Sequence, residues 1–415
     1  MRILFVHQNF PGQYLHILVA LARMGGHSLV GLGIEKPNEA LPKGVKCVRY
    51  KLRRGNTPGI HPWALEFESK VIRGEACAAA AFDLKQKGFR PDLICAHPGW
   101  GEALFLKQIW PGCPLLCYQE FFYRSTGFDL GFDPELQGES DWRGEARTCM
   151  KNAYLLQTLE TADWNITPTA CQQSSFPVKW HQRISTIHDG IDTRRAAPVP
   201  DPSPLTLPDG TELKAGDPIV TFVNRRLEPY RGCHSFLRSL PALQRQVPEA
   251  RVVIVGETRG VSYGAACKSG EWKDVFLAEI EGHYDPSRVH FTGPLPYATF
   301  LQLLRLSACH VYLTYPFVLS WSLLEAMSCG CPVVGSATAP VEEVIVDGSN
   351  GVLVDFFSPS DIAAAVADLL RHRRRAHGLG EKARDTVVSR YSLERCVPRQ
   401  LALMDLVAAR AIGSP

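Results

Sequence analysis

Two arginines in the second half of the chain, Arg226 and Arg231, have the type and spacing of residues that do chemistry. They follow the apolar run VTFV, and Arg226 closes an expected strand. Two guanidinium groups held together can bind a diphosphate and neutralise the charge of a leaving group. A solvated loop would carry the same pair, so the diphosphate hypothesis needs a second element nearby.

The stretch 311–335 supplies that second element. VYLTY is expected to form a short buried strand, a loop of residues 316–319 follows, and a helix begins with Ser320 or Ser322 as its cap. A loop between a strand and a helix offers unpaired backbone N–H groups and the positive end of the helix dipole to an anion. The sequence therefore predicts an anion site formed by this loop and the arginine pair.

Glu325 lies about one turn inside the predicted helix and points back toward its first turn. A carboxylate beside a phosphate is electrostatically unfavourable unless it binds a neutral part of the same ligand. Sugar hydroxyls fit that description. The alternative is an exposed helical glutamate with no special task, and the local pattern leaves both interpretations open.

The elements that position these residues alternate between strand and helix. This rhythm predicts an α/β fold with two doubly wound, Rossmann-like domains facing a cleft, with ligands beyond the carboxyl ends of the strands. Residues 1–196 are predicted to form the first domain and residues 219–390 the second. Residues 197–218, rich in Pro, Asp and Gly, are predicted to be a linker. Residues 391–415 are predicted to be a C-terminal helix that packs back on the first domain.

Composition excludes several classes of protein. The 415 residues are 45% hydrophobic and 21% charged, and a net charge of +3 gives no case for nucleic-acid binding. No apolar run reaches the roughly 18 residues of a membrane span, and MRILFVHQ lacks the features of a signal peptide, so a cytoplasmic location is expected. The 13 cysteines lie mostly in apolar segments, as reduced core thiols do. Because no zinc spacing or Asp-any-Asp motif lies in a suitable place, we expect neither a metal nor a cofactor.

The second half of the chain resembles the donor-binding domain of the retaining glycosyltransferases of family 4, which have the GT-B fold. The resemblance spans most of residues 219–391. The motifs that carry it, in order, are Arg226 with Arg231 and Gly232, VHFTGPLP, LLEAMSCGCPVVGS and EEVIVDGSNGVLVDFFSPSDIAAAVADLL. The resemblance implies that the backbone around Gly293 and Leu295 holds the nucleotide base and that Glu325 binds the ribose hydroxyls.

Two positions in this half depart from the family pattern. The family has Lys at the place of Arg231, and it usually has a Glu that contacts the donor sugar at the place of Phe317. Either the sugar is held by loop N–H groups and a serine, or the donor differs, and a weak or inactive enzyme also remains open. The residues left to hold the sugar are Phe317, Val318, Leu319, Ser320 and Ser322.

The first half resembles the acceptor domain of the family more loosely. Gly12 in NFPGQ matches the glycine loop that approaches the diphosphate, and HDGID, with Asp189, takes the place of the family's Asn-Gly-Ile/Val-Asp signature. The place of a family histidine after the strand PLLCY is taken by Glu120, while His97 ends the preceding strand. We predict catalytic roles for both, with a structural strand-end histidine as the alternative for His97.

The activity that the resemblance implies is metal-independent transfer of a glycosyl group, with retention, from a nucleotide-diphosphate sugar to an acceptor hydroxyl. A UDP-sugar is the favoured donor and GDP-mannose the alternative. The acceptor is a glycan, a lipid-linked sugar or a small aglycone. An aromatic-rich segment, residues 100–132, is expected either to face this acceptor or to belong to the core. Rival functions are a sugar-nucleotide epimerase on the same fold and a non-catalytic protein that binds sugar nucleotides.

A basic run, RHRRR at residues 371–375, bears on where the protein works. It could touch anionic lipid head groups, as a peripheral enzyme at the inner membrane face would. A solvated helix face is the more common use of such a run. The sequence leaves both open.

Overall fold

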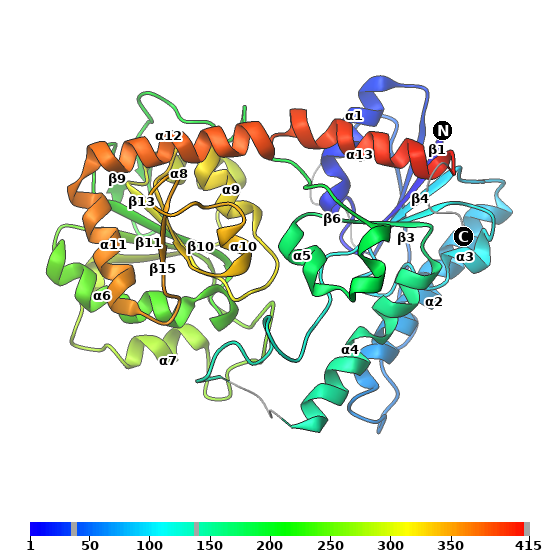
Figure 1. The fold of residues 1–415 in the computed structure, drawn as a ribbon, viewed down its shortest axis with the longest axis horizontal. Coiled ribbons are helices and arrows are strands. Elements are labelled where there is room, and N and C mark those ends of the chain that lie inside the picture. Colours follow the sequence, from blue (N-terminus) through cyan, green and yellow to red (C-terminus); the bar gives the residue numbers. More distant parts are fainter. Residues whose placement is uncertain (35–39, 137–140, 411–415) are drawn as a thin grey trace. The chain divides into compact units, whose positions relative to one another are not determined.

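The chain divides into two compact units, which Figure 1 draws as a ribbon. The computed structural model describes residues 1–34, 40–136 and 141–410. The first unit is Met1–Gly190 with Leu393–Pro415, and the second is Ile191–Ser392. The chain therefore passes from the first unit to the second before the predicted boundary at residue 196. Both units have a parallel sheet with helices, so the predicted α/β fold class is confirmed.

The sheet of the first unit has the strand order β3-β2-β1-β4-β5-β6-β7 within the described residues. Its strands are β1 (Arg2–Val6), β2 (Ser28–Gly33), β3 (Lys46–Arg49), β4 (Leu93–Ala96), β5 (Leu115–Tyr118), β6 (Trp164–Thr167) and β7 (Ile184–Thr186). β1 pairs with β2 on one side and with β4 on the other. The order of strands reverses between β1 and β4, and ligands of α/β sheets bind at the carboxyl ends of strands on either side of such a reversal.

Successive residues of β1 pack into different cores. Ile3 and Phe5 lie in the core beneath α1 (Leu15–Met24) and α13 (Leu393–Ala408), and Figure 1 shows these two helices side by side. Leu4 and Val6 lie in the core beneath α2 (Leu65–Gln86) and α3 (Leu106–Ile109). Burial on both faces explains why RILFV is apolar nearly throughout, as expected of a central parallel strand. The other helices of this unit are α4 (Trp142–Thr161) and α5 (Ala170–Ser175).

The sheet of the second unit has the strand order β12-β11-β10-β13-β14-β15. Its strands are β10 (Ile219–Arg226), β11 (Arg251–Glu257), β12 (Val289–Gly293), β13 (Cys309–Tyr312), β14 (Val333–Ser336) and β15 (Val352–Val354). Its helices are α6 (Cys233–Gln246), α7 (Trp272–Ala278), α8 (Tyr297–Leu306), α9 (Trp321–Ser328), α10 (Ala339–Glu342), α11 (Pro359–Arg371) and α12 (Arg373–Arg390). The order of strands reverses between β10 and β13; Arg226 ends β10, Arg231 follows it, and the predicted anion loop follows β13 at this reversal.

The segment predicted to be a linker is instead part of the second unit. It contains the antiparallel hairpin of β8 (Leu205–Thr206) and β9 (Glu212–Leu213), whose leucines are buried in that unit's core. The residues Pro-Asp-Gly at 208–210 form the hairpin turn, closed by hydrogen bonds between Leu207 and Thr211 and between Gly210 and Leu207. Turn-forming residues were mistaken for linker residues because the two flanking strands are only two residues long.

Candidate active site

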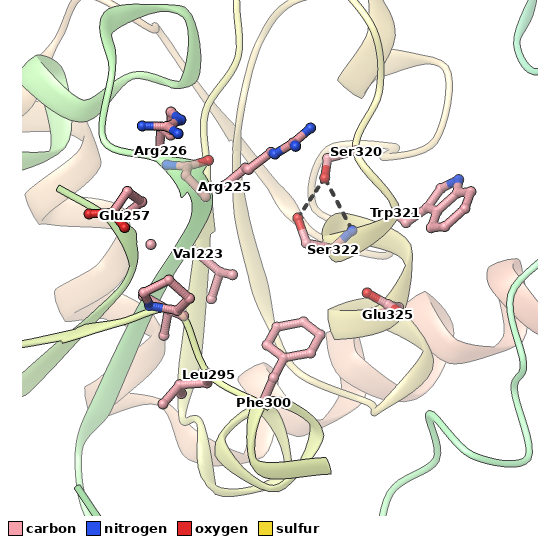
Figure 2. Close-up of a pocket in the computed structure, with 14 residues that line it drawn as sticks. Val223, Arg225, Arg226, Glu257, Leu295, Phe300, Ser320, Trp321, Ser322 and Glu325 are labelled. Carbon is pink, nitrogen blue, oxygen red and sulfur yellow. Dashed lines mark hydrogen bonds between the residues drawn. The ribbon is translucent and has the colours of Figure 1, made fainter. Parts of the chain in front are cut away.

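The second unit contains a pocket of about 550 Å³ at the reversal of its strand order (Figure 2). It is lined by the ends of β10 and β11, by the loop after β12 and by the first turns of α9. Of the residues predicted from the sequence, the pocket brings together Arg226, Leu295, Ser320, Ser322 and Glu325. Arg231, Gly293, Phe317, Val318 and Leu319 do not line it.

Two neighbouring arginines of β10, Arg225 and Arg226, both line the pocket. Successive residues of a regular strand point to opposite faces, but the pairing of β10 with β11 shifts register between Val223 and Arg226. At this irregularity both residues line the pocket, and Nη1 of Arg226 also donates to the carbonyl oxygen of Arg259. In the view of Figure 2, Arg225 extends toward Ser320 and Arg226 lies near the end of β11. Arg225 was not predicted, because the spacing to Arg231 and the family motif both point to Arg226.

Arg231 lies inside the protein, with only 7% of its surface exposed. Its Nη1 atom donates to the carbonyl oxygen of Val318 at 2.8 Å, to Oγ1 of Thr314 at 2.9 Å and to Oη of Tyr312 at 3.2 Å. These acceptors belong to β13 and the loop that follows it. The second predicted arginine therefore contacts the predicted anion loop from inside the unit, behind the pocket.

Phe317, which stands where the family usually has a glutamate, is buried to 2% exposure. Its ring packs against Tyr263 at 4.8 Å and against Tyr230 at 5.5 Å between centroids. The loop that carries Tyr263 is fixed by Glu228, whose Oε2 accepts from the backbone N–H groups of Ser262 and Tyr263. Burial raises the pKa of Glu228, and these two amide hydrogen bonds oppose that effect. An apolar ring at this position thus turns into the protein and joins the aromatic cluster.

Helix α9 begins as the sequence predicted, with Ser320 as its N-cap. The Ser320 Oγ atom accepts from the Ser322 amide at 3.3 Å, and the Ser320 amide donates to Oη of Tyr312 at 2.8 Å. Both amides are therefore satisfied within the protein. The hydroxyl groups of the two serines lie 2.9 Å apart at the pocket wall, as Figure 2 shows.

Glu325 faces the pocket from α9 and is partly buried. Its Oε1 atom accepts a hydrogen bond from Oη of Tyr297 at 2.7 Å. Burial raises the pKa of the Glu325 carboxyl, while the Tyr297 hydroxyl and the nearby Arg195 act in the opposite direction. Two other pocket residues, Glu257 and Phe300, had no distinguishing signal in the sequence.

The loop after β12 contributes Leu295 to the pocket, whereas Gly293 ends the strand with φ of +67°. A Cβ atom on Gly293 would meet no protein atom within 4 Å, so within the protein it is the backbone conformation that favours glycine there.

In the first unit, His7 and His97 follow the two strands that flank the reversal of strand order. The rings of these buried histidines lie 5.0 Å apart. Nδ1 of His7 accepts from the Asn9 amide at 3.0 Å, and Nδ1 of His97 accepts from the Gly99 amide at 3.1 Å. A nitrogen that accepts cannot carry the proton, so both neutral rings hold their proton on Nε2.

Burial lowers the pKa of both rings, to about 4 for His7, where Gln13 and the Asn9 amide act in the opposite direction. The pKa of His97 falls well below its usual value through burial and, in smaller part, through His7 and Lys70. Both are therefore neutral at pH 7. His7 was not among the predicted site residues, although its position directly after β1 matches that of His97 after β4.

Glu120 lies beside this pair, with its Oε2 atom 4.0 Å from Nε2 of His97. The ring of Trp100 lies 4.7 Å from that of His97, and the ring of Tyr118 stacks on that of His97 at 5.4 Å between centroids. The hydroxyl of Tyr118 donates to Oδ2 of Asp189, in the predicted signature HDGID, at 3.0 Å. Nε2–H donors beside a carboxylate form a set that can hold a hydroxyl group, because a hydroxyl both accepts and donates.

Gly12 adopts φ of +49° in the loop between β1 and α1. A Cβ atom at this position would lie 2.4 Å from the His7 ring. The predicted glycine loop therefore packs directly against the His7 ring. Of the aromatic-rich segment, Trp110, Phe121 and Phe122 belong to the buried core.

The basic run at residues 371–375 is largely engaged within its own unit. Arg371 donates to the Gln246 carbonyl at 2.5 Å and Arg373 to the Gly216 carbonyl at 3.5 Å. His372 and Arg375 both contact the carboxylate of Asp368. The described ranges contain no group of three or more His, Cys, Asp or Glu side chains that could hold a metal ion. No helix among those same residues is both long and apolar enough to cross a bilayer.

Two glycosyltransferase families match the chain in succession. The Glycosyl transferase family 4 group matches residues 25–196, and the Glycosyl transferases group 1 family matches residues 207–386. Together these matches take in both units and the pocket of the second.

Curated proteins with related sequences are glycosyltransferases. The chain is 27% identical over 331 residues to D-inositol 3-phosphate glycosyltransferase 2 of Catenulispora acidiphila, covering 76% of this chain and 69% of that protein. It is 29% identical over 203 residues to the GDP-mannose-dependent alpha-(1-6)-phosphatidylinositol monomannoside mannosyltransferase of Mycolicibacterium smegmatis, covering 47% and 49%. The match to an uncharacterized glycosyltransferase of Methanocaldococcus jannaschii is 25% identical and covers 41% of each. The chain thus spans less than half the length of the last two relatives.

Solved structures share the fold over nearly the whole chain. Sucrose-phosphate synthase from Thermosynechococcus elongatus has a TM-score of 0.72 at 18% identity, covering 99% of this chain and 100% of that one. HepE of Anabaena, in complex with UDP and glucose, has a TM-score of 0.65 at 15% identity, covering 97% and 98%. These likenesses confirm the predicted GT-B fold.

Proposed function

The chain belongs to the family 4-type glycosyltransferases, and on that premise we propose that it moves a sugar from a nucleotide-diphosphate sugar to an acceptor hydroxyl, with retention. One observation carries the proposal. A single pocket at the strand reversal of the second unit combines two arginines from β10, the capped start of α9 and the carboxylate of Glu325. Cations suit a diphosphate, and a carboxylate suits neutral hydroxyls of the same ligand.

The arginines are proposed to bind the departing diphosphate. Arg226 was expected there from the sequence, and Arg225 now joins it because both line the pocket. Their guanidinium groups neutralise the charge that develops as the bond from sugar to phosphate breaks. We propose that they replace a divalent cation in this role, so that turnover needs no metal.

The chemical step needs no nucleophile from the protein in this proposal. The acceptor hydroxyl attacks the anomeric carbon on the face from which the diphosphate leaves, through an oxocarbenium-like state. The leaving phosphate oxygen takes the hydroxyl proton, so charge and protons balance. Arg231 is assigned to holding the loop that contains Val318, because its Nη1 contacts that loop directly.

The donor is proposed to be a UDP-sugar first and GDP-mannose second. Two relatives support this pair of choices, since the HepE structure is a complex with UDP and glucose, and the Mycolicibacterium enzyme is GDP-mannose-dependent. The base is expected near Leu295, where the loop after β12 meets the pocket.

In the first unit, the hydroxyl-holding set is proposed to be His97, Glu120 and the newly found His7. Neutral imidazole donors can hydrogen-bond a hydroxyl oxygen, while the nearby carboxylate can accept its proton. This combination disfavours an anionic group, which the carboxylate would repel. Uncharged hydroxyl-bearing groups, on a glycan, a lipid-linked sugar or a small aglycone, are therefore the acceptor class we propose.

The first test is a thermal-shift panel of UDP, GDP, ADP and TDP, each with and without its common sugar conjugates, in magnesium and in EDTA. A ligand that binds only the folded state raises the melting temperature. We expect stabilisation by one base, equal in magnesium and in EDTA. No shift with any nucleotide would contradict the donor site, and a shift that needs magnesium would contradict the metal-independent role of the arginines.

A further inference from the structure

Glu325 is held by two residues that do not themselves line the pocket, Tyr297 and Arg195. Tyr297, the first residue of α8, donates its hydroxyl to Oε1 of Glu325 at 2.7 Å. The guanidinium group of Arg195 lies over the Tyr297 ring, 4.4 Å from its centroid. The three side chains form a stack that ends at the pocket wall, with Glu325 as its innermost member.

The position of Arg195 is fixed by bonds to the backbone around it. Arg305 donates to the carbonyl oxygens of Arg195 at 2.7 Å and of Ala197 at 2.9 Å. The carbonyl oxygen of Ala196 accepts from Oγ of Ser328 at 2.5 Å. The backbone that carries Arg195 is therefore attached to α8 and α9, and its exposed side chain lies over the Tyr297 ring.

The hydrogen bond from Tyr297 leaves the two oxygens of Glu325 in different states. Oε1 is occupied, whereas Oε2 receives no hydrogen bond or ion pair from any described residue. A carboxylate with one oxygen anchored has a fixed plane, and its second oxygen is presented to a ligand. Vicinal hydroxyls, such as those of a ribose, are donors that fit such an acceptor.

The groups facing Glu325 also determine its charge. Tyr297 approaches from α8, Arg195 from the segment before β8, and Cys329 from the C-cap of α9. Burial disfavours the carboxylate, while the hydrogen bond and the positive charge favour it. Removing either favourable group would raise the pKa of the Glu325 carboxyl, because less would oppose the effect of burial.

We propose that Tyr297 and Arg195 are positioning residues, which keep Glu325 ionised and turned so that Oε2 accepts hydrogen bonds from the ribose hydroxyls of the donor. The inference rests on the proposed donor site. Neither residue contacts the nucleotide in this scheme, because both act through the carboxylate.

The test uses the full chain and isothermal titration with UDP and GDP between pH 5.5 and 8. Tyr297→Phe removes only the anchoring hydroxyl, and we expect nucleotide affinity to fall roughly three- to tenfold at pH 7. The acid limb of the affinity profile should move to higher pH, because the carboxylate loses the hydrogen bond that favours its ionised form. Arg195→Gln should move the limb in the same direction. Tyr284→Phe, the same change at a tyrosine away from the pocket, is the matched control and should leave both quantities unchanged.

A ligand without the relevant hydroxyls separates this role from a general loss of structure. The Tyr297→Phe variant and the unaltered protein should bind 2′,3′-dideoxyuridine diphosphate equally, since this ligand lacks the ribose hydroxyls that Glu325 would bind. If Glu325→Gln weakens UDP binding but Tyr297→Phe changes neither affinity nor pH profile, the positioning role is wrong. If Glu325→Gln itself has no effect, the ribose assignment in the proposed function fails instead. If neither UDP nor GDP binds the unaltered protein, the donor site and this inference fail together.

Discussion

Nη1 of Arg231 donates to the carbonyl oxygen of Val318 at 2.8 Å, which joins the turn of 3-10 helix after β10 to the loop after β13. The same atom reaches Oγ1 of Thr314, near the other end of that loop. One buried cation thus fixes the loop between β13 and α9 at two points. Arg231 was expected to bind the ligand. In the structure its hydrogen bonds stabilise the loop that shapes the pocket.

The first prediction concerns this buried cation. Arg231→Ala should lower the free energy of unfolding by roughly 3 kcal/mol, because three acceptors, including the buried Val318 carbonyl, lose a charged donor. Urea denaturation measures this, and Arg231→Lys should lose less because it keeps the charge. Unchanged stability together with lost binding of nucleoside diphosphates would show that Arg231 acts on the ligand and not on the loop.

The second prediction concerns the pocket arginines. Arg225→Ala and Arg226→Ala should each lower donor turnover by roughly a hundredfold, since each removes a donor to the leaving group, with little change in melting temperature. Release of nucleoside diphosphate from the donor identified by thermal shift measures the effect. Arg245→Ala, on the exposed side of α6, is the control and should keep full turnover. Normal turnover in both pocket variants would remove the diphosphate assignment.

The third prediction concerns Gly12. Gly12→Ala should cost roughly 3 kcal/mol or more of stability, because its φ of +49° strains a side chain and the new Cβ would lie 2.4 Å from the His7 ring. Gly348→Ala separates the two causes: that glycine has φ of +67°, but a Cβ there would meet nothing within 4 Å, so about 1 kcal/mol is expected. Equal losses in the two variants would contradict the contact with His7.

The fourth prediction concerns pH and His310, which is fully buried with its pKa lowered to about 3. The unfolded chain takes up a proton near pH 6.5 and the folded one does not, so this residue makes stability fall as pH decreases from about 6.5 toward 3. Between pH 7.5 and 5 it should account for about 2 kcal/mol.

Buried carboxyls with raised pKa, such as Glu102 and Glu228, change stability in the opposite direction, because the folded state binds their proton first. The pH dependence of the free energy of unfolding of one protein therefore sums several groups. The difference in that free energy between two proteins that differ only at residue 310 is more informative. Urea denaturation of the unaltered protein and of His310→Gln at both pH values isolates the single group. Parallel pH profiles in the two proteins would contradict the lowered pKa.

Much of the fold could be predicted because its central strands are buried on both faces and so are apolar in the sequence, as RILFV and IVTFV are. The short hairpin of β8 and β9 could not. Its two strands contain one leucine each, too few to show the alternation of apolar and polar residues that marks a strand. Its Pro-Asp-Gly turn has the composition of a linker.

The sequence by itself determined the class of the protein, the start of α9 at Ser320 and the choice of Arg226 and Glu325 as pocket residues, because local patterns specify strands, helix starts and residue types. Only the tertiary structure decided which groups share a pocket. A register shift in β10 brought in Arg225, burial took Phe317 and Arg231 behind the loop, and the strand reversal set His7 beside His97. Tyr297 reaches Glu325 from another helix. Such neighbours are far apart in the chain, and their meeting depends on packing that no local pattern records.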